Sequence, residues 1–215
     1  MYEDDGLLMA GKYFVTGIGT EVGKTMVSAV LCEALEADYW KPVQAGDPDH
    51  TDSMKIAELI SNKKTIIHPE RYKPSEPMSP HAAAQLDKVR ISPRDFELPK
   101  TENKLIVEGA GGVMVPLNDY YHMASLMDDL HLPVILVSRN YLGSINHTLL
   151  SVEVLRYMDI QIAGIIFNGE RNHTTESHIE EYTGLQILAR IPQVDQWDKK
   201  TVADLAKRVR EEFPA

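Results

Sequence analysis

The stretch YFVTGIGTEVGKT, residues 13–25, decides the fold, because an apolar strand pattern leads into a glycine-rich turn and then into a helix. Backbone N–H groups of such a turn and of the helix N-terminus can bind phosphate oxygens. Lys24 can neutralise the outer phosphates, and the Thr25 hydroxyl can bind Mg²⁺. The glycine spacing departs from the strict GxxxxGK[ST] pattern, which would require glycine in place of Ile18. The stretch predicts a nucleotide-binding loop, with a purely structural glycine turn as the alternative.

Strand and helix patterns alternate along the rest of the chain. This alternation predicts an α/β fold, with a mostly parallel sheet and helices on both faces, as in the three-layer architecture of P-loop NTPases. Residues 67–99 hold six prolines and predict a long loop with one short helix near 81–87. Apolar patterning indicates strands at 13–16, 39–43, 104–107, 133–138, 162–167 and, more weakly, 186–191, and helices at 25–37, 52–60, 124–130, 144–158, 174–182 and 201–212.

The composition of the 215 residues fits one compact domain, since 43% are hydrophobic and 25% charged. We expect this domain to span residues 12–215, after a flexible N-terminal extension at residues 1–11. The net charge of −10 argues against general binding to nucleic acid or to an anionic membrane. No apolar run reaches the roughly 18 residues of a membrane-spanning helix. The lone Cys32 and an acidic start, unlike a secretion signal, predict a cytoplasmic protein.

Acidic residues that could share a metal ion with Thr25 occur at two further places. Glu108 ends an apolar strand pattern and precedes a glycine-rich turn, so it could point into the crevice at the carboxyl ends of the strands. Asp52 could be a second ligand, or simply a helix N-cap or first-turn acid. Lys41 follows the second strand pattern and is either a surface lysine or a contact to phosphate or substrate. The sequence contains neither an HExxH zinc motif nor a GxSxG nucleophile motif.

Several blocks together resemble the dethiobiotin synthetase family of the biotin pathway. They are TGIGTEVGKT, KPVQAG, TDS, EPMSPH, VEGAGGVMVPL, LPVILVSRNYLGSINHTLLS and GIIFN, in the order and at the spacing of that family. The resemblance covers most of the chain and includes the unusual glycine spacing. It implies that ATP drives carboxylation and ring closure of 7,8-diaminopelargonate with CO₂ or bicarbonate, giving dethiobiotin, ADP and phosphate. Positioned cations would stabilise the carbamate and phosphoryl charge, without a protein nucleophile.

The resemblance also implies roles for individual residues. Lys24 and Lys41 would be catalytic, and Mg²⁺ would be held by Thr25, Asp52 and Glu108. ATP would contact Glu21, Val22, Gly23, Lys24, Thr25, Met26, Asp52, Glu108, Gly109, Ala110, Gly111, Asn168, Pro192, Gln193 and Val194. The substrate would contact Thr20, Lys41, Ala45, Gly143, Ser144 and Asn146, the last three across the interface of a homodimer with a shared active site.

Some of these positions keep a simpler interpretation. Asn168 could be a turn residue, and the 143–146 segment could serve only helix capping or dimer packing. Ala45 stands where some family members have a hydroxyl residue that contacts substrate, so Gln44 or a backbone group would have to replace that contact. The family's acidic nucleotide contact near the C-terminus has no clear counterpart in this sequence.

Two other functions compete with this one. A nucleotide-switch ATPase of the partitioning type would share the phosphate loop, but it carries an extra lysine early in the loop, where this chain has Gly19. The other is an ATP-dependent synthetase of the amidotransferase type, which normally brings a glutaminase domain that 215 residues cannot accommodate.

Overall fold

The computed structural model describes residues 11–213, so all of the expected N-terminal extension except Gly11 lies outside the described residues. One sheet of seven strands runs through this part of the chain, and all of its strand pairings are parallel. The strand order is β3-β2-β4-β1-β5-β6-β7. The strands are β1 (Lys12–Gly17), β2 (Asp38–Trp40), β3 (Ile67–His68), β4 (Leu105–Gly112), β5 (Val134–Ser138), β6 (Ile162–Asn168) and β7 (Ile187–Ile191).

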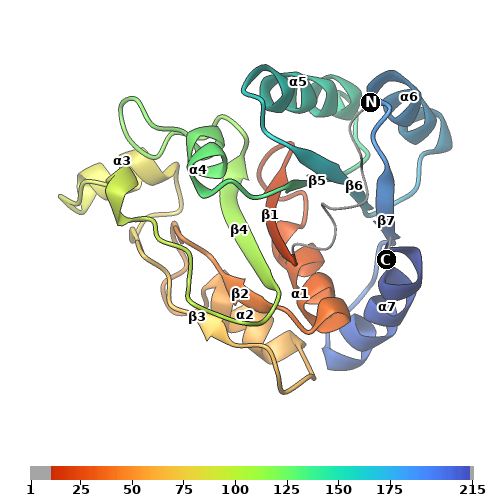
Figure 1. Cartoon of the computed structure of the whole chain (residues 1–215), viewed down its shortest axis with the longest axis horizontal. Helices are drawn as coiled ribbons and strands as arrows, with labels where there is room; N and C mark the ends of the chain where they lie inside the picture. The colour runs from red at the N-terminus through yellow and green to blue at the C-terminus, as the bar shows by residue number, and fades with distance from the viewer. Residues whose placement is uncertain (1–10, 214–215) are drawn as a thin grey trace.

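Helices cover both faces of this sheet. Figure 1 shows α4 and α5 above the sheet and α1, α2 and α7 below it. The three layers confirm the predicted α/β architecture. The helices are α1 (Lys24–Leu35), α2 (Asp52–Leu59), α3 (Pro80–Leu86), α4 (Met123–Leu130), α5 (Ser144–Tyr157), α6 (His173–Thr183) and α7 (Lys199–Glu212), with a short 3₁₀ helix, η3 (Pro93–Asp95).

The central strands are buried along most of their length, as strands covered on both faces must be. All five residues of β5, VILVS, are buried, and so are the last five of β1. Helix α1 packs against this centre with Val27, Val30 and Leu31, which are fully buried. Burial of this apolar surface holds the phosphate loop, which connects β1 to α1, on a rigid base.

The structure corrects three of the expected boundaries. β2 ends at Trp40 rather than at residue 43, since Pro42 has no N–H to donate to a neighbouring strand. β4 does not end at Glu108 but continues through the glycines to Gly112, with a register shift opposite β1. The segment 67–99 was predicted as a loop with one short helix; it also contains β3 and η3.

The other predicted elements are present within a few residues of the expected bounds. Among residues 11–213, the structure contains no helix with the length and apolar character needed to cross a bilayer.

Candidate active site

The phosphate loop turns sharply between β1 and α1. Glu21 and Gly23 adopt left-handed backbone conformations, with φ of 58° and 90°. A Cβ atom at Gly23 would lie 2.1 Å from Asn168 Nδ2, so any other residue there would displace the Asn168 side chain and would also be strained by the positive φ. Lys24 begins α1 and donates from Nζ to the carbonyl oxygen of Gly19 at 3.0 Å. This lysine folds back over the loop, as a residue that binds phosphates there would.

Lys41 lies at the centre of a buried charged cluster at the carboxyl edge of the sheet. Its Nζ lies 2.5 Å from Asp52 Oδ2 and 2.9 Å from Glu108 Oε1. Thr25 Oγ1 donates to the same Glu108 oxygen at 2.9 Å. Asp52 is the first residue of α2, which Thr51 caps, so Asp52 is a first-turn acid and not the N-cap. The interpretation of Lys41 as a surface lysine is wrong, since it is only 4% exposed.

Burial and the neighbouring charges shift the pKa values of this cluster in opposite directions. Burial lowers the pKa of Lys24 to about 8, against a partial rise caused by Glu108. Burial would lower the pKa of Lys41 too, but the carboxylates of Glu108 and Asp52 outweigh it and raise that pKa. Burial would raise the pKa of Asp52, but Lys41 and Lys55 lower it overall. The cluster therefore holds the Lys41 ammonium between the carboxyl groups of Asp52 and Glu108.

The charged cluster faces a cavity of about 730 Å³. Twelve residues that the sequence predicted for the site line this cavity, and some that it did not assign line it too. The predicted ones are Thr20, Glu21, Gly23, Lys24, Thr25, Met26, Lys41, Ala45, Asp52, Glu108, Ala110 and Gly111. The others are Lys55, Pro77, Met78, Ser79, Pro80 and Val115, together with Gln44, which the sequence offered only as a replacement for the contact at Ala45.

The signals for the additional lining residues are uneven. Residues 77–80 belong to the EPMSPH block, whose resemblance to the family already marked it, although no role was assigned. Gln44 accepts a hydrogen bond from the Asp52 N–H at 3.1 Å and donates to the Gly46 carbonyl at 3.0 Å. Its amide therefore fixes α2 beside the KPVQAG segment. No sequence motif marks Lys55. It reaches the cavity because it lies about one helical turn after Asp52.

The remaining predicted residues lie outside the lining of this cavity. Asn168 donates from Nδ2 to the Val22 carbonyl at 2.9 Å, so it supports the phosphate loop instead of serving only as a turn residue. Ser144 is buried at the start of α5 and accepts from the Tyr141 N–H at 3.3 Å. The residues that the structure does not bring to the cavity are Val22, Gly109, Gly143, Ser144, Asn146, Asn168, Pro192, Gln193 and Val194.

The donor set at the charged cluster fits a hard divalent cation. Two carboxylates and a hydroxyl, from Asp52, Glu108 and Thr25, supply the oxygen ligands that Mg²⁺ prefers. Within residues 11–213, no group of three or more His, Cys, Asp or Glu side chains is arranged to hold a metal, and the third oxygen of this set is the Thr25 hydroxyl.

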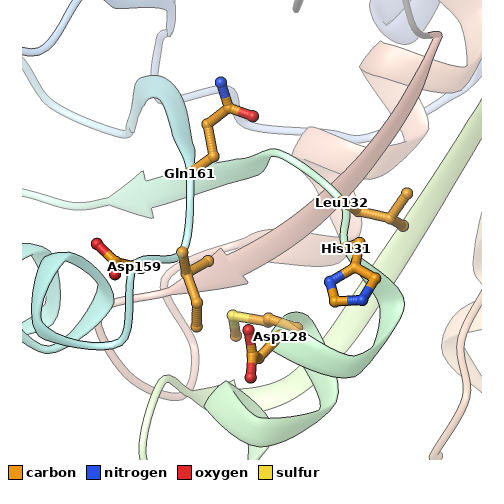
Figure 2. A pocket seen from close by; sticks show the side chains of 7 residues that line it. Asp128, His131, Leu132, Asp159 and Gln161 are labelled. Atoms are coloured by element: carbon orange, nitrogen blue, oxygen red, sulfur yellow. The ribbon is translucent and has the colours of Figure 1, made fainter.

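A second cavity, of about 200 Å³, lies at the opposite edge of the sheet. Figure 2 shows Asp128 and His131 at the end of α4 and Asp159 and Gln161 in the turn before β6. These residues precede β5 and β6, at the amino ends of the strands. Ligands of open α/β sheets bind at the carboxyl ends, where the phosphate loop and Lys41 lie. The larger cavity is therefore the candidate active site.

A family model and curated relatives show the family of this chain, and a solved structure shares its fold. A family model described as "AAA domain" matches residues 11–201. The chain is 48% identical to an ATP-dependent dethiobiotin synthetase of Christiangramia forsetii, over 94% of this chain and 97% of the relative. It is also 48% identical to the enzyme of that name from Cytophaga hutchinsonii, over 92% and 96%. The septum site-determining protein MinD from Pyrococcus horikoshii, complexed with Mg-ADP, shares the fold with a TM-score of 0.58 at 15% identity, covering 92% of this chain and 94% of that one.

Proposed function

The chain belongs to the AAA domain family and, within it, to the ATP-dependent dethiobiotin synthetases, and we propose that it converts 7,8-diaminopelargonate, CO₂ and ATP into dethiobiotin, ADP and phosphate. It is an enzyme of the ligase kind, and it closes a ring by forming C–N bonds. The observation that carries the proposal is the cavity in which Lys24 and Lys41 face the oxygen donors of Thr25, Asp52 and Glu108. We assign the activity to a single domain, residues 12–215, in the cytoplasm.

The chemistry of the proposed reaction matches this arrangement of charges. A substrate amine captures CO₂ as a carbamate, a carbamate oxygen attacks the ATP γ-phosphate, and the second amine then displaces phosphate as the ring closes. Negative charge gathers on the carbamate and phosphoryl oxygens, so fixed cations lower the barrier. Lys24 would hold the β- and γ-phosphates, and Lys41 would steer the carbamate towards the γ-phosphate. The reaction needs no protein nucleophile.

Thr25, Asp52 and Glu108 would hold Mg²⁺, which when bound would neutralise charge on the ATP phosphates. Lys41 contacts both carboxylates, so it keeps Asp52 on α2 close to Glu108 on β4. Burial of the cluster strengthens these interactions, because little water is present to screen them.

The nucleotide and the substrate would bind on two sides of these cations. The ATP phosphates would lie over Glu21, Gly23 and Met26, with Gly109, Ala110 and Gly111 opposite them. The adenine would lie towards Asn168 and the segment Pro192, Gln193 and Val194. Thr20 and Ala45 line the same cavity as Lys41, and the diamine would bind to them there. Gln44 is hydrogen-bonded to two backbone groups, so we assign the missing hydroxyl contact at Ala45 to a backbone group.

A second copy of the chain would complete the site. Gly143, Ser144 and Asn146 do not line the cavity of their own chain, which supports a role across a homodimer interface. Leu142, directly before α5, is fully exposed, and Leu150, halfway along α5, is 57% exposed, so the first half of this helix presents apolar surface. The N-terminus of α5 suits the carboxylate of the substrate.

The test is ADP release with ATP, Mg²⁺ and bicarbonate, with and without 7,8-diaminopelargonate, and identification of the product by mass. Release that depends on the diamine and yields dethiobiotin is the expected result. Release without the diamine would favour a switch ATPase. ATP binding without any release would indicate a different acceptor, as in other ATP-dependent synthetases.

A further inference from the structure

Tyr39 is a buried tyrosine in the middle of β2, and its hydroxyl group contacts the candidate active site. The side chain is fully buried, and Oη donates to Glu108 Oε2 at 2.9 Å. In the sheet Tyr39 pairs with Ile106, so Glu108 lies two residues further along β4 and on the same face. The contact therefore follows from the strand register.

The two oxygens of Glu108 have different partners. Oε1 accepts from Thr25 and Lys41, which line the cavity, whereas Oε2 accepts from Tyr39 inside the protein. Glu108 itself is fully buried, so a rotation of its carboxylate would leave Oε2 without water to replace the lost hydrogen bond. Its orientation thus depends on the phenol.

We propose that Tyr39 is a positioning residue, which holds the Glu108 carboxylate with Oε1 directed at Thr25 and Lys41 and thereby sets the affinity of the site for a divalent cation. The proposal rests on the metal role given to Glu108 under the proposed function and extends it to a residue outside the cavity. Hydrogen-bond partners of metal ligands fix ligand orientation in this way in other metal sites.

The polar groups of the two neighbouring aromatic residues, Tyr39 and Trp40, have different kinds of partner: Trp40 bonds to a backbone carbonyl, and Tyr39 bonds to a side chain of the candidate site. Trp40 donates from Nε1 to the Pro69 carbonyl at 3.1 Å, which links β2 to the segment directly after β3. The ring of Tyr39 would fill its place in the core equally well as phenylalanine. The hydroxyl adds only the bond to Glu108, so removing it tests the proposal with little change in packing.

The experiment measures Mn²⁺ binding to Tyr39→Phe in the presence of a non-hydrolysable ATP analogue, by the EPR signal of free Mn²⁺. We expect affinity about tenfold below that of the wild type. In ADP release, the Mg²⁺ concentration for half-maximal rate should rise by a similar factor, while the KM for the diamine at saturating Mg²⁺ changes less than about twofold. Unchanged Mn²⁺ affinity would overturn the proposal.

Tyr121→Phe is the matched control, because this buried tyrosine donates to Asp129 Oδ2 at 2.6 Å and does not line the cavity. It should bind Mn²⁺ as the wild type does. An equal loss in both variants would show general destabilisation and overturn the proposal. The Mn²⁺ measurement does not require dethiobiotin formation, so a failure of the proposed function would be recognised separately.

A double variant tests whether Tyr39 acts through Glu108. In the Glu108→Gln background, adding Tyr39→Phe should cause no further loss of Mn²⁺ affinity, because the carboxylate that the phenol orients is already gone. A further loss as large as in the wild-type background would contradict the proposal. If Tyr39→Phe alone folds poorly, Glu108→Gln can still be compared with the double variant. Glu108→Gln removes the buried carboxylate, which would otherwise lack its hydrogen-bond partner.

Discussion

Two buried carboxylates, on adjacent strands of the sheet, have different kinds of partner. Asp38 begins β2 and Glu108 lies in β4, and both are fully buried. Asp38 accepts from Thr101 Oγ1 at 2.7 Å, from Asn103 Nδ2 at 2.9 Å and from the Ile66 N–H at 2.9 Å, and the His68 ring lies 3.1 Å away. Glu108 instead contacts Lys41, Thr25 and Tyr39.

The difference separates a structural acid from the one that we propose to be a metal ligand. The partners of Asp38 lie in the segments 66–68 and 101–103, so this carboxylate links both segments to the start of β2. Asp38 does not line the active-site cavity. Glu108 lines the cavity and forms an ion pair with the Lys41 ammonium. Burial alone therefore says little about the role of an acid, and the charge and location of its partners decide it.

Removal of Mg²⁺ should reduce activity more than any other change, and it should act through the cluster around Glu108 and not through Asp38. With excess chelator, dethiobiotin formation should fall by more than about 100-fold, since the phosphate charge is no longer neutralised. The urea midpoint of the nucleotide-free protein should change little, because Mg²⁺ binds weakly without the ATP phosphates and then adds little stability. Product assays and denaturation curves with and without EDTA measure both. Activity that survives chelation would contradict the assignment of Thr25, Asp52 and Glu108.

Lys41→Gln should come next, with turnover reduced about 10²- to 10³-fold and ATP affinity little changed. The reason is that the cation at Lys41 is needed most when carbamate and phosphoryl charge meet in the transition state. Single-turnover kinetics and ATP titration separate the two quantities, and circular dichroism checks that the variant is folded. Turnover equal to that of the wild type would remove Lys41 from the mechanism.

Asp38→Asn should show the opposite pattern, a loss of stability without a loss of turnover. The amide presents N–H groups to donors that now bond a carboxylate, and we expect the free energy of unfolding to fall by about 2 kcal/mol. Urea denaturation measures the loss, and kcat per folded molecule should match that of the wild type. A large drop in kcat with an unchanged midpoint would mean that Asp38 affects the active site directly.

The pH dependence of that stability difference gives a smaller and more specific signal. Burial would raise the pKa of Asp38, but hydrogen bonds from Thr101, Asn103, Ile66 and His68 lower it overall, below the ordinary value of 3.8. The contribution of Asp38 is therefore full above pH 3.8 and decreases as the pH falls towards the folded-state pKa. Urea midpoints of wild type and Asp38→Asn should converge below pH 3.8. Parallel curves down to pH 3 would refute this linkage.

Much of the fold and part of the candidate site could be predicted from the sequence, because apolar strand runs and the GKT loop are local signals. Lys24, Thr25 and Glu108 were predicted as one site and line one cavity. Tyr39 could not be found in this way, since a tyrosine in an apolar strand looks like core and only the register with β4 brings it to Glu108. The two-residue strand β3 was missed as well, because its place depends on pairing with β2 and not on its own pattern.

Lys55→Met should have the smallest effect, although Lys55 lines the same cavity as Lys41. Its side chain is 28% exposed, and its Nζ lies 3.4 Å from Asp52 Oδ1. Lys41 Nζ lies closer to the same carboxylate, at 2.5 Å from Oδ2. Solvent screens such a pair, so we expect a stability loss below about 1 kcal/mol. Turnover should change less than about threefold, because Lys41 keeps Asp52 in place.

Salt distinguishes the two lysines. In 0.5 M NaCl the difference in turnover between wild type and Lys55→Met should become smaller. The Debye length then falls below about 5 Å, so exposed ion pairs are screened. The turnover defect of Lys41→Gln should persist at the same salt concentration, because Lys41 is buried. Steady-state kinetics at low and high salt give both comparisons. A defect in Lys55→Met as large as in Lys41→Gln, and resistant to salt, would make Lys55 a third fixed cation of the reaction and extend the functional cluster from β4 onto the exposed side of α2.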